Sequence, residues 1–577
     1  SVSMSATNGS AGAISNSEAI SAGTSVTMNA GTSISNTAVT ANAGSVSMTA
    51  TNAGITNTGA VQAIGDNSSV SMTATNTDAG AISNSDIVSA GKDVTETAGT
   101  TLTNTGAVTA TAGAIEQKAG GKLWNEKAVS AGTTVKMTST GAEIQNDTTV
   151  TAGTTLTQDA HTTLTNTGAV QATGIDQDAV TSITNSSTVK ATTGAITQDL
   201  AGAIHNVGKV DAGTTIGMTS TGAGIQNDAN VTAGTGITMN AGAAIDNSNS
   251  NLTVSSAEGN IELKAGTSII NDIVTATAGS ISMNTATSES GTTIENTGAV
   301  TAGTNITQNA KTTLTNDSTV TATGAIDQDA VGKIWNKNTV QAGTTIDMTS
   351  TGADIQNDAN VTAGTGITMG ASTAIDNSNS NLTVSSTSGG ISLTAGTDIK
   401  NDIVNAGGAV SMDTATNGTG SIENTGAVTA GTNITQNAKT TLTNTGAVTA
   451  TAGAIDQDAV GKIWNKLAVD GKTTVDMTST GDAIQNDTTV KAGTTLTQNA
   501  YTSLTNTGAV QAATGITINA GTSISNGSTV EATGGSISMT ATDKGITNTG
   551  AVTATGASSS VSMSATNGSA GAISNSE

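Results

Sequence analysis

One short pattern recurs from one end of this 577-residue chain to the other: an aliphatic residue, any residue, then Asn, with Val three or four residues later. Leu164, Asn166 and Val170 form one instance. The Asn occurs 27 times, and successive copies are mostly 19 to 22 residues apart. A period this short and regular predicts one small unit of secondary structure that is stacked many times.

The composition agrees with a stacked repeat. The chain has no Cys, Pro or Phe, and only 35 % of its residues are hydrophobic, nearly all of them small. Such residues are too few and too small to fill one globular core of this length. Disorder is disfavoured because only 10 % of residues are charged and the apolar residues keep a fixed register. A thin solenoid is the remaining solution.

Within one unit, apolar or amide residues alternate with polar residues in three short runs, residues 156–160, 164–166 and 170–172. Alternation with a period of two, interrupted by Gly and Asn, is typical of β-strands. The sequence therefore predicts an all-β fold: a right-handed parallel β-helix (β-solenoid) of about 27 coils of 20–21 residues. Strands of successive coils would pair at about 4.8 Å, which gives a rod of roughly 130 Å.

Two columns of polar side chains are expected to line the thin core. Met or Gln stands eight residues before the signature Asn, as at Met28, Gln158 and Gln308, and alternation points this residue inward. The signature Asn should form a second ladder at a turn. Buried amides in such columns must hydrogen-bond to one another along the axis. Representative members of the Asn ladder are Asn104, Asn166, Asn316, Asn444 and Asn506.

Longer repeats are superimposed on the coil period. Residues 212–341 and 342–471 are related copies, and residues 1–18 recur unchanged at 560–577. We therefore expect residues 1–577 to form a single continuous β-solenoid, and the 559-residue spacing to be one period of a longer fibre. Neither end shows the polar cap of a free-standing solenoid, which predicts end-to-end continuation with further copies.

Units such as AGTTLTQDAHTTLTNTGAVQA resemble the haemagglutinin-type repeats of filamentous haemagglutinin and related giant bacterial exoproteins. The resemblance extends over the whole chain. It implies a β-helical shaft that is secreted and works outside the cell or at its surface, as an adhesin or as a fibre. The expected function is thus a structural filament segment. Its expected partners are further copies of itself, end to end or in lateral bundles, and also glycans or cell surfaces.

Three Trp residues are the candidate contact residues. Each stands one residue before the signature Asn, so alternation points it outward, and each has a Lys two positions earlier. Aromatic side chains on a polar rod can bind sugar rings or seat a neighbouring filament. A carbohydrate-binding shaft is therefore the alternative function, while the simpler interpretation is that each ring packs over a local turn. The three are Trp124, Trp335 and Trp464.

Three Asp-x-Asp pairs are weak candidates for calcium binding. Two carboxylates on one face of a strand lie about 7 Å apart, and calcium prefers oxygen ligands. A solvated acidic surface is the competing interpretation, and no other metal or cofactor is expected. The pairs are Asp176 with Asp178, Asp327 with Asp329, and Asp456 with Asp458.

Other functional classes are disfavoured by composition. A net charge of −24 without any Arg argues against nucleic acid binding, and no apolar run is long enough for membrane insertion. Catalysis is not expected: a polysaccharide-degrading β-helix needs convergent acid and base groups, whereas His161 and His205 fall in different columns. Ice binding is disfavoured because the outward positions vary among Thr, Asp, Lys, Gln and Trp.

Overall fold

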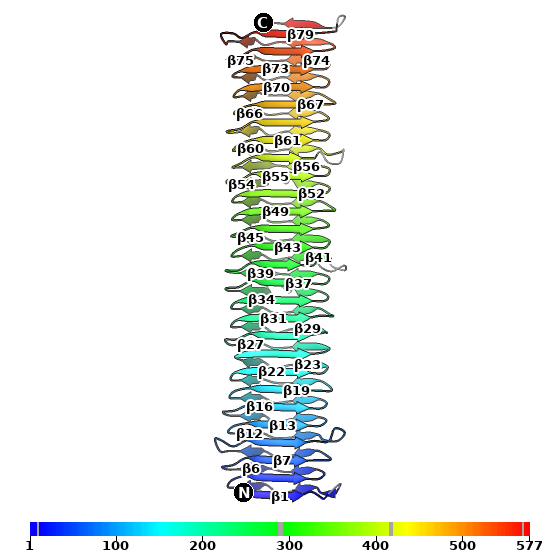
Figure 1. The fold of residues 1–577 in the computed structure, drawn as a ribbon, viewed down its shortest axis with the longest axis vertical. Coiled ribbons are helices and arrows are strands. Elements are labelled where there is room, and N and C mark those ends of the chain that lie inside the picture. Colours follow the sequence, from blue (N-terminus) through cyan, green and yellow to red (C-terminus); the bar gives the residue numbers. More distant parts are fainter. Residues whose placement is uncertain (9–10, 287–291, 415–418, 568–570, 577) are drawn as a thin grey trace. The chain divides into compact units, whose positions relative to one another are not determined.

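The computed structural model describes residues 1–8, 11–286, 292–414, 419–567 and 571–576. The chain divides into two compact units, Ser1–Gly291 and Thr292–Glu577. The first unit contains the strands from β1 (Val2–Ala6) to β40 (Ile281–Asn284), and the second contains those from β41 (Thr293–Asn296) to β80 (Ala572–Asn575). Figure 1 shows the strands of each unit stacked as successive turns.

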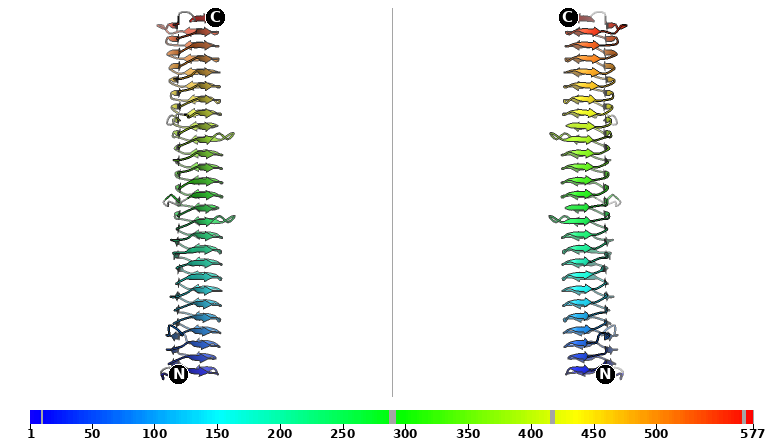
Figure 2. Two further views of the ribbon diagram at one scale, coloured as in Figure 1. Left: turned by 90° about the vertical axis from the view of Figure 1, so that its right-hand side faces the viewer. Right: turned by 90° about the vertical axis from the view of Figure 1, so that its left-hand side faces the viewer.

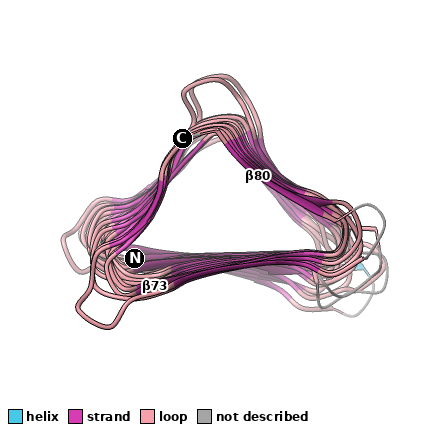
Figure 3. Ribbon diagram, turned by 90° about the horizontal axis from the view of Figure 1, so that it is seen from above, coloured by secondary structure: helices cyan, strands magenta, loops and turns pink. Residues whose placement is uncertain are grey.

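Each unit is a parallel β-solenoid with three strands per turn. The turn that contains Asn166 consists of β22 (Thr155–Ala160), β23 (Thr163–Asn166) and β24 (Val170–Ala172). These strands belong to three parallel sheets, here called A, B and C, which form the three sides around the core (Figure 3). The predicted all-β, parallel β-solenoid fold is confirmed, and its right-handed sense stays a prediction from the connection rule.

Strands of successive turns pair residue for residue. Strand β22 pairs with β25 (Gly174–Ala179) one turn later, so that Leu156 aligns with Ile175 and Gln158 with Gln177. Figure 2 shows this stacking from the sides of the solenoid. Because each column holds the same kind of residue, an insertion within a strand would bring outward residues into the core.

The core contains the alternate residues that the sequence pattern points inward. In the turn of Asn166 these are Leu156, Gln158, Leu164, Asn166 and Val170, each at most 1 % exposed. Burial of a Leu or Val side chain contributes on the order of 1.5 to 3 kcal/mol. Stability is therefore distributed over many equivalent turns.

The Gly of the signature permits a close approach between turns. A Cβ atom on Gly168, between β23 and β24, would lie 2.1 Å from the carbonyl carbon of Thr148 in the preceding turn. Only a residue without a side chain fits there. This requirement explains why Thr-Gly-Ala-Val so often follows the signature Asn.

The long sequence repeats occupy equivalent positions in the fold. Residues 1–18 supply β1 and β2 (Ile14–Asn16) of the first unit, and residues 560–577 supply β79 (Val561–Ala565) and β80, the corresponding strands of a turn in the second unit. Asn251 and Asn381, at matching positions of the 212–341 and 342–471 copies, share the same left-handed φ of 65°. Continuity of residues 1–577 in one solenoid and the 559-residue fibre period stay predictions.

Candidate functional site

The interior of both units contains the expected ladder of amide side chains. Asn146 Nδ2 donates to Asn166 Oδ1 at 2.9 Å, and Asn166 Nδ2 donates to Asn185 Oδ1 at 2.9 Å. Gln158 and Asn166 exchange two hydrogen bonds of 2.9 and 3.0 Å, and Gln177 donates to Gln158 at 2.9 Å. The signature residues Asn104, Asn166, Asn316, Asn444 and Asn506 are all buried in this way.

One residue of the Met/Gln column is a carboxylic acid. Glu96, in β13 (Val94–Ala98), aligns with Met72 on one side and Gln117 on the other, and it is fully buried. Its carboxylate accepts hydrogen bonds from Asn84 at 2.7 Å, Asn104 at 3.0 Å and Gln117 at 2.8 Å. Burial raises the pKa of Glu96, and these three donors oppose the rise. Glu96 stands eight residues before Asn104, where the sequence pattern predicts Met or Gln.

The three Trp side chains point outward from sheet B, as expected, but they are half-buried. Trp335 lies in β47 (Ile334–Asn336), and its indole Nε1 donates to Asp358 of the next turn at 2.7 Å. Trp124 and Trp464 make the same bond to Asp147 and Asp487, each at 2.8 Å. Each ring therefore connects two successive turns.

Lysine side chains lie over the Trp rings. The ammonium groups of Lys333 and Lys337 are 4.9 and 4.4 Å from the centre of the Trp335 ring. Trp464 has the same arrangement with Lys462 and Lys466, both at 4.4 Å, whereas Lys122 lies over Trp124 at 5.0 Å. The expected pairing of each Trp with the Lys two positions earlier is confirmed. The second Lys beside Trp335 and Trp464 was not anticipated.

A fourth cluster of the same design is built on His205. His205 occupies the Trp position of its turn and lies 2.7 Å from Asp228 Oδ2, and Gln226 donates to the other oxygen of Asp228 at 2.8 Å. The same Gln-to-Asp bond accompanies Trp124, where Gln145 donates to Asp147 at 2.8 Å. All four clusters share one sequence feature that could have revealed them. Ile-Gln-Asn-Asp follows one turn later, at residues 144–147, 225–228, 355–358 and 484–487.

The Asp pairs lie on the outer face of sheet A. Asp176 and Asp178 belong to β25, and Asp178 is aligned between Asp159 and Asp199 of the neighbouring turns. Partial burial and the surrounding carboxylates raise the pKa of Asp178 to about 6. Within the described residues, no group of three or more Asp, Glu, His or Cys side chains has the arrangement of a metal site. Calcium binding thus stays a prediction.

The other two pairs lie in the second unit, in β46 (Ile326–Ala330) and β64 (Ile455–Ala459). Burial, followed by repulsion from neighbouring carboxylates, raises the pKa of Asp327 and Asp456. Burial and a neighbouring carboxylate also raise the pKa of Asp458, and a hydrogen bond from Thr478 opposes this rise.

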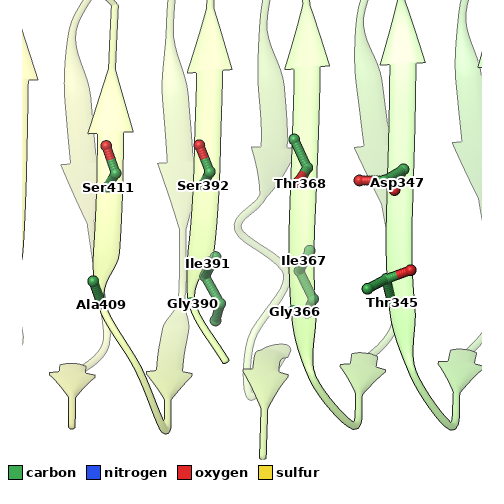
Figure 4. A pocket seen from close by; sticks show the side chains of 10 residues that line it. All are labelled: Thr345, Asp347, Gly366, Ile367, Thr368, Gly390, Ile391, Ser392, Ala409 and Ser411. Atoms are coloured by element: carbon green, nitrogen blue, oxygen red, sulfur yellow. The ribbon is translucent and has the colours of Figure 1, made fainter. Parts of the chain in front are cut away.

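An open hollow of about 320 Å³ lies on the outer face of sheet A in the second unit. It crosses β49 (Thr345–Ser350), β52 (Gly366–Ala371), β55 (Ile391–Ala395) and β58 (Val410–Asp413). Figure 4 shows Asp347, Thr368, Ser392 and Ser411 in one row across these strands. This lining offers hydrogen bonds from hydroxyl groups and one carboxylate, but it brings no acid and base together.

Comparison of the chain with protein-family models, with curated proteins and with solved structures gives no significant match. Among the described residues, no helix has the length and hydrophobicity that crossing a membrane would require. The class of protein is therefore defined by the fold alone, a parallel β-solenoid with an amide-laddered core.

Proposed function

We propose that this chain is a segment of an extracellular structural filament, in which the β-solenoid provides a long, stiff shaft for adhesion or fibre assembly. The observation that carries the proposal is the hydrogen-bonded ladder inside each unit. Within the described part of each unit, successive turns are joined by three parallel sheets and by Asn-to-Asn bonds such as Asn316 to Asn336 at 2.8 Å. Bending such a stack would stretch the hydrogen bonds between turns on its convex side.

The outer surface supports a structural role as well. The largest side chains that the strands point outward, the Trp rings, are bonded to Asp residues of the next turn. Lys333 and Lys337 lie over the Trp335 ring, on the surface that a sugar would have to stack against. The Trp clusters therefore favour a role in holding turns together over the alternative of glycan binding.

The secreted location and the resemblance to haemagglutinin-type repeats belong to the same proposal. Immunogold labelling of intact cells of the source organism, with an antibody against folded protein, should decorate filaments outside the cell. Labelling confined to the cell interior would contradict the proposal. A glycan array with the wild-type chain tests the alternative, because specific binding that is lost in Trp335→Thr and Trp464→Thr would favour an adhesin acting through Trp.

A further inference from the structure

One turn of the second unit presents opposite charges on two adjacent faces. Its outward residues run in the order Asp456, Asp458, Val460, Lys462 and Trp464. The two Asp residues lie on sheet A in β64, and Trp464 lies on sheet B in β65 (Ile463–Asn465), with Lys462 directly before that strand. Val460 stands at the corner between the sheets and is 45 % exposed. These five residues are called the corner patch.

The corner patch has an equivalent in the same unit. Asp327, Asp329, Val331, Lys333 and Trp335 follow the same order on β46 and β47, with Val331 50 % exposed. The two patches are six turns apart, which corresponds to about 29 Å along the solenoid. A partner that binds one patch in a parallel orientation can therefore bind both.

The charged residues of the corner patch, Asp456, Asp458 and Lys462, form no ion pair within the described part of the chain, although Lys439 lines one hollow with Asp458 and Val460. The Lys462 ammonium donates instead to the neutral side chain of Gln485 at 2.6 Å. An acidic face next to a basic face, with an exposed apolar residue between them, is complementary to a copy of itself.

We propose that the corner patch binds the corner patch of a second copy of this chain, with the two solenoids side by side and parallel. A two-fold axis parallel to the solenoid axis brings Asp458 of each copy next to Lys462 of the other, and the two Val460 side chains meet at the axis. The two copies need no shift along the solenoid axis relative to each other, because Asp458 and Lys462 belong to the same turn. In an antiparallel pair, Asp458 of one copy would face Asp458 of the other, and the two carboxylates would repel each other.

This inference rests on the proposed function, because a long shaft presents the patch repeatedly and weak contacts then add. The first unit provides a natural contrast. At the equivalent positions around Trp124 it has Glu116, Lys118, Lys122 and Glu126, so each face carries both signs of charge. Its acidic pair Asp176 and Asp178 lies in a turn without Lys or Trp on sheet B, where Thr184 takes the Trp position.

Charge reversal in the full-length chain tests the pairing. Sedimentation velocity at low salt should show self-association of the wild-type chain that is lost at high salt, because screening acts within about 10 Å at 0.1 M. Asp329→Lys with Asp458→Lys should weaken it about tenfold or more, and Lys333→Asp with Lys462→Asp should do the same. An equimolar mixture of the two variants should associate again, since every contact between them is attractive.

The matched control is Asp176→Lys with Asp178→Lys in the first unit, which changes the net charge by the same amount and should leave association unchanged. A monomeric wild-type chain, failure of the mixture to associate, or an equal effect of Asp176→Lys with Asp178→Lys would overturn the proposal. The frictional ratio of the unpaired chain reports its elongation in the same experiment. Compact unpaired chains would contradict the shaft itself, whereas elongated chains that never pair would contradict only this inference.

Cross-linking tests the parallel, in-register geometry. The chain has no Cys, so Val460→Cys introduces one thiol at the proposed axis, where diamide can oxidise two such thiols to an intermolecular disulfide. A disulfide requires Cα atoms about 5.5 to 6 Å apart. Disulfide-linked dimers are expected for Val460→Cys and not for Thr449→Cys on sheet C, in β63 (Val448–Ala450). Equal dimer yields, or no dimer from Val460→Cys, would contradict the geometry.

Discussion

Asn166 uses its whole side chain inside the core. Asn166 donates to Gln158 and Asn185, and its oxygen accepts from Gln158 and Asn146. A buried amide is tolerated only if its donors and acceptors are satisfied, and a chain of such bonds strengthens each member. An Asn side chain has the length and the two polar ends that reach the turns above and below.

Replacement of Asn166 by Ala should therefore be costly. It leaves Asn146 Nδ2 without an acceptor and removes one hydrogen-bond partner each from Asn185 and from both polar atoms of Gln158, and we expect a loss of about 3 kcal/mol in local stability. Hydrogen exchange of β23 and its neighbours measures this directly. Thr165→Ala, at the adjacent outward position, is the control and should change stability by less than about 0.5 kcal/mol. Equal effects of the two substitutions would contradict the ladder's role.

Glu96 gives the first unit a pH-dependent stability. Burial raises the pKa of Glu96, so the folded state binds its proton more tightly than the unfolded state does. The contribution of Glu96 to stability is then fully present at acid pH and is lost as the pH rises from the unfolded pKa through the folded pKa. Glu96→Gln should stabilise the unit at neutral pH, by about 1 to 3 kcal/mol, because no charge is buried.

Urea unfolding of Glu96→Gln and the wild-type chain at several pH values checks this prediction. Glu116→Gln, on the outer face of the same sheet, serves as the control for a change in net charge. A stability difference between Glu96→Gln and wild type that does not depend on pH would contradict it.

At the scale of strands, Asp178 on sheet A, which is aligned between Asp159 and Asp199, should titrate unusually. Burial, followed by repulsion from Asp176 and the column itself, raises the pKa of Asp178 to about 6. Because the folded pKa is the higher one, these turns lose stability as the pH rises towards about 6 and above. Carboxyl NMR shifts should show a midpoint near this value, and a midpoint at the usual value near 4 would contradict the arrangement.

The Trp clusters should stabilise the contact between neighbouring turns. Trp335→Thr removes the bond to Asp358 and the contacts of Lys333 and Lys337, and we expect a cost of about 1 to 2 kcal/mol. Hydrogen exchange in β47 and in β50 (Ile355–Asn357) should accelerate while distant turns are unaffected. Thr315→Ser, at the aligned position one turn earlier, is the control. Unchanged hydrogen exchange in Trp335→Thr would show that the ring does not stabilise the contact between these turns.

Much of the fold could be predicted from the sequence because a solenoid repeats one local pattern. The inward positions of Leu156, Gln158 and Asn166 follow from alternation alone. The partners of Trp335 do not, because Asp358 and Lys337 are brought to the ring by the turn geometry and by the stacking of the next coil. Glu96 was missed for a related reason: alternation indicates which residues are buried, but not which chemistry the core can satisfy.

For the whole molecule, the account predicts stability that depends on nearest neighbours. Each turn contacts mainly the turns before and after it, so a local defect should remain local. The proposed shaft also requires the two units to continue one another as a single solenoid. This continuity is the central claim, because a filament segment transmits length and stiffness only if its turns are uninterrupted.

Electron cryo-microscopy of the full-length chain tests that claim most directly. We expect one straight shaft of roughly 130 Å with a repeat of about 4.8 Å along its axis. Longer fibres of the native material should show the same repeat through every junction. Two short solenoids joined at variable angles, or particles without this repeat, would contradict the account.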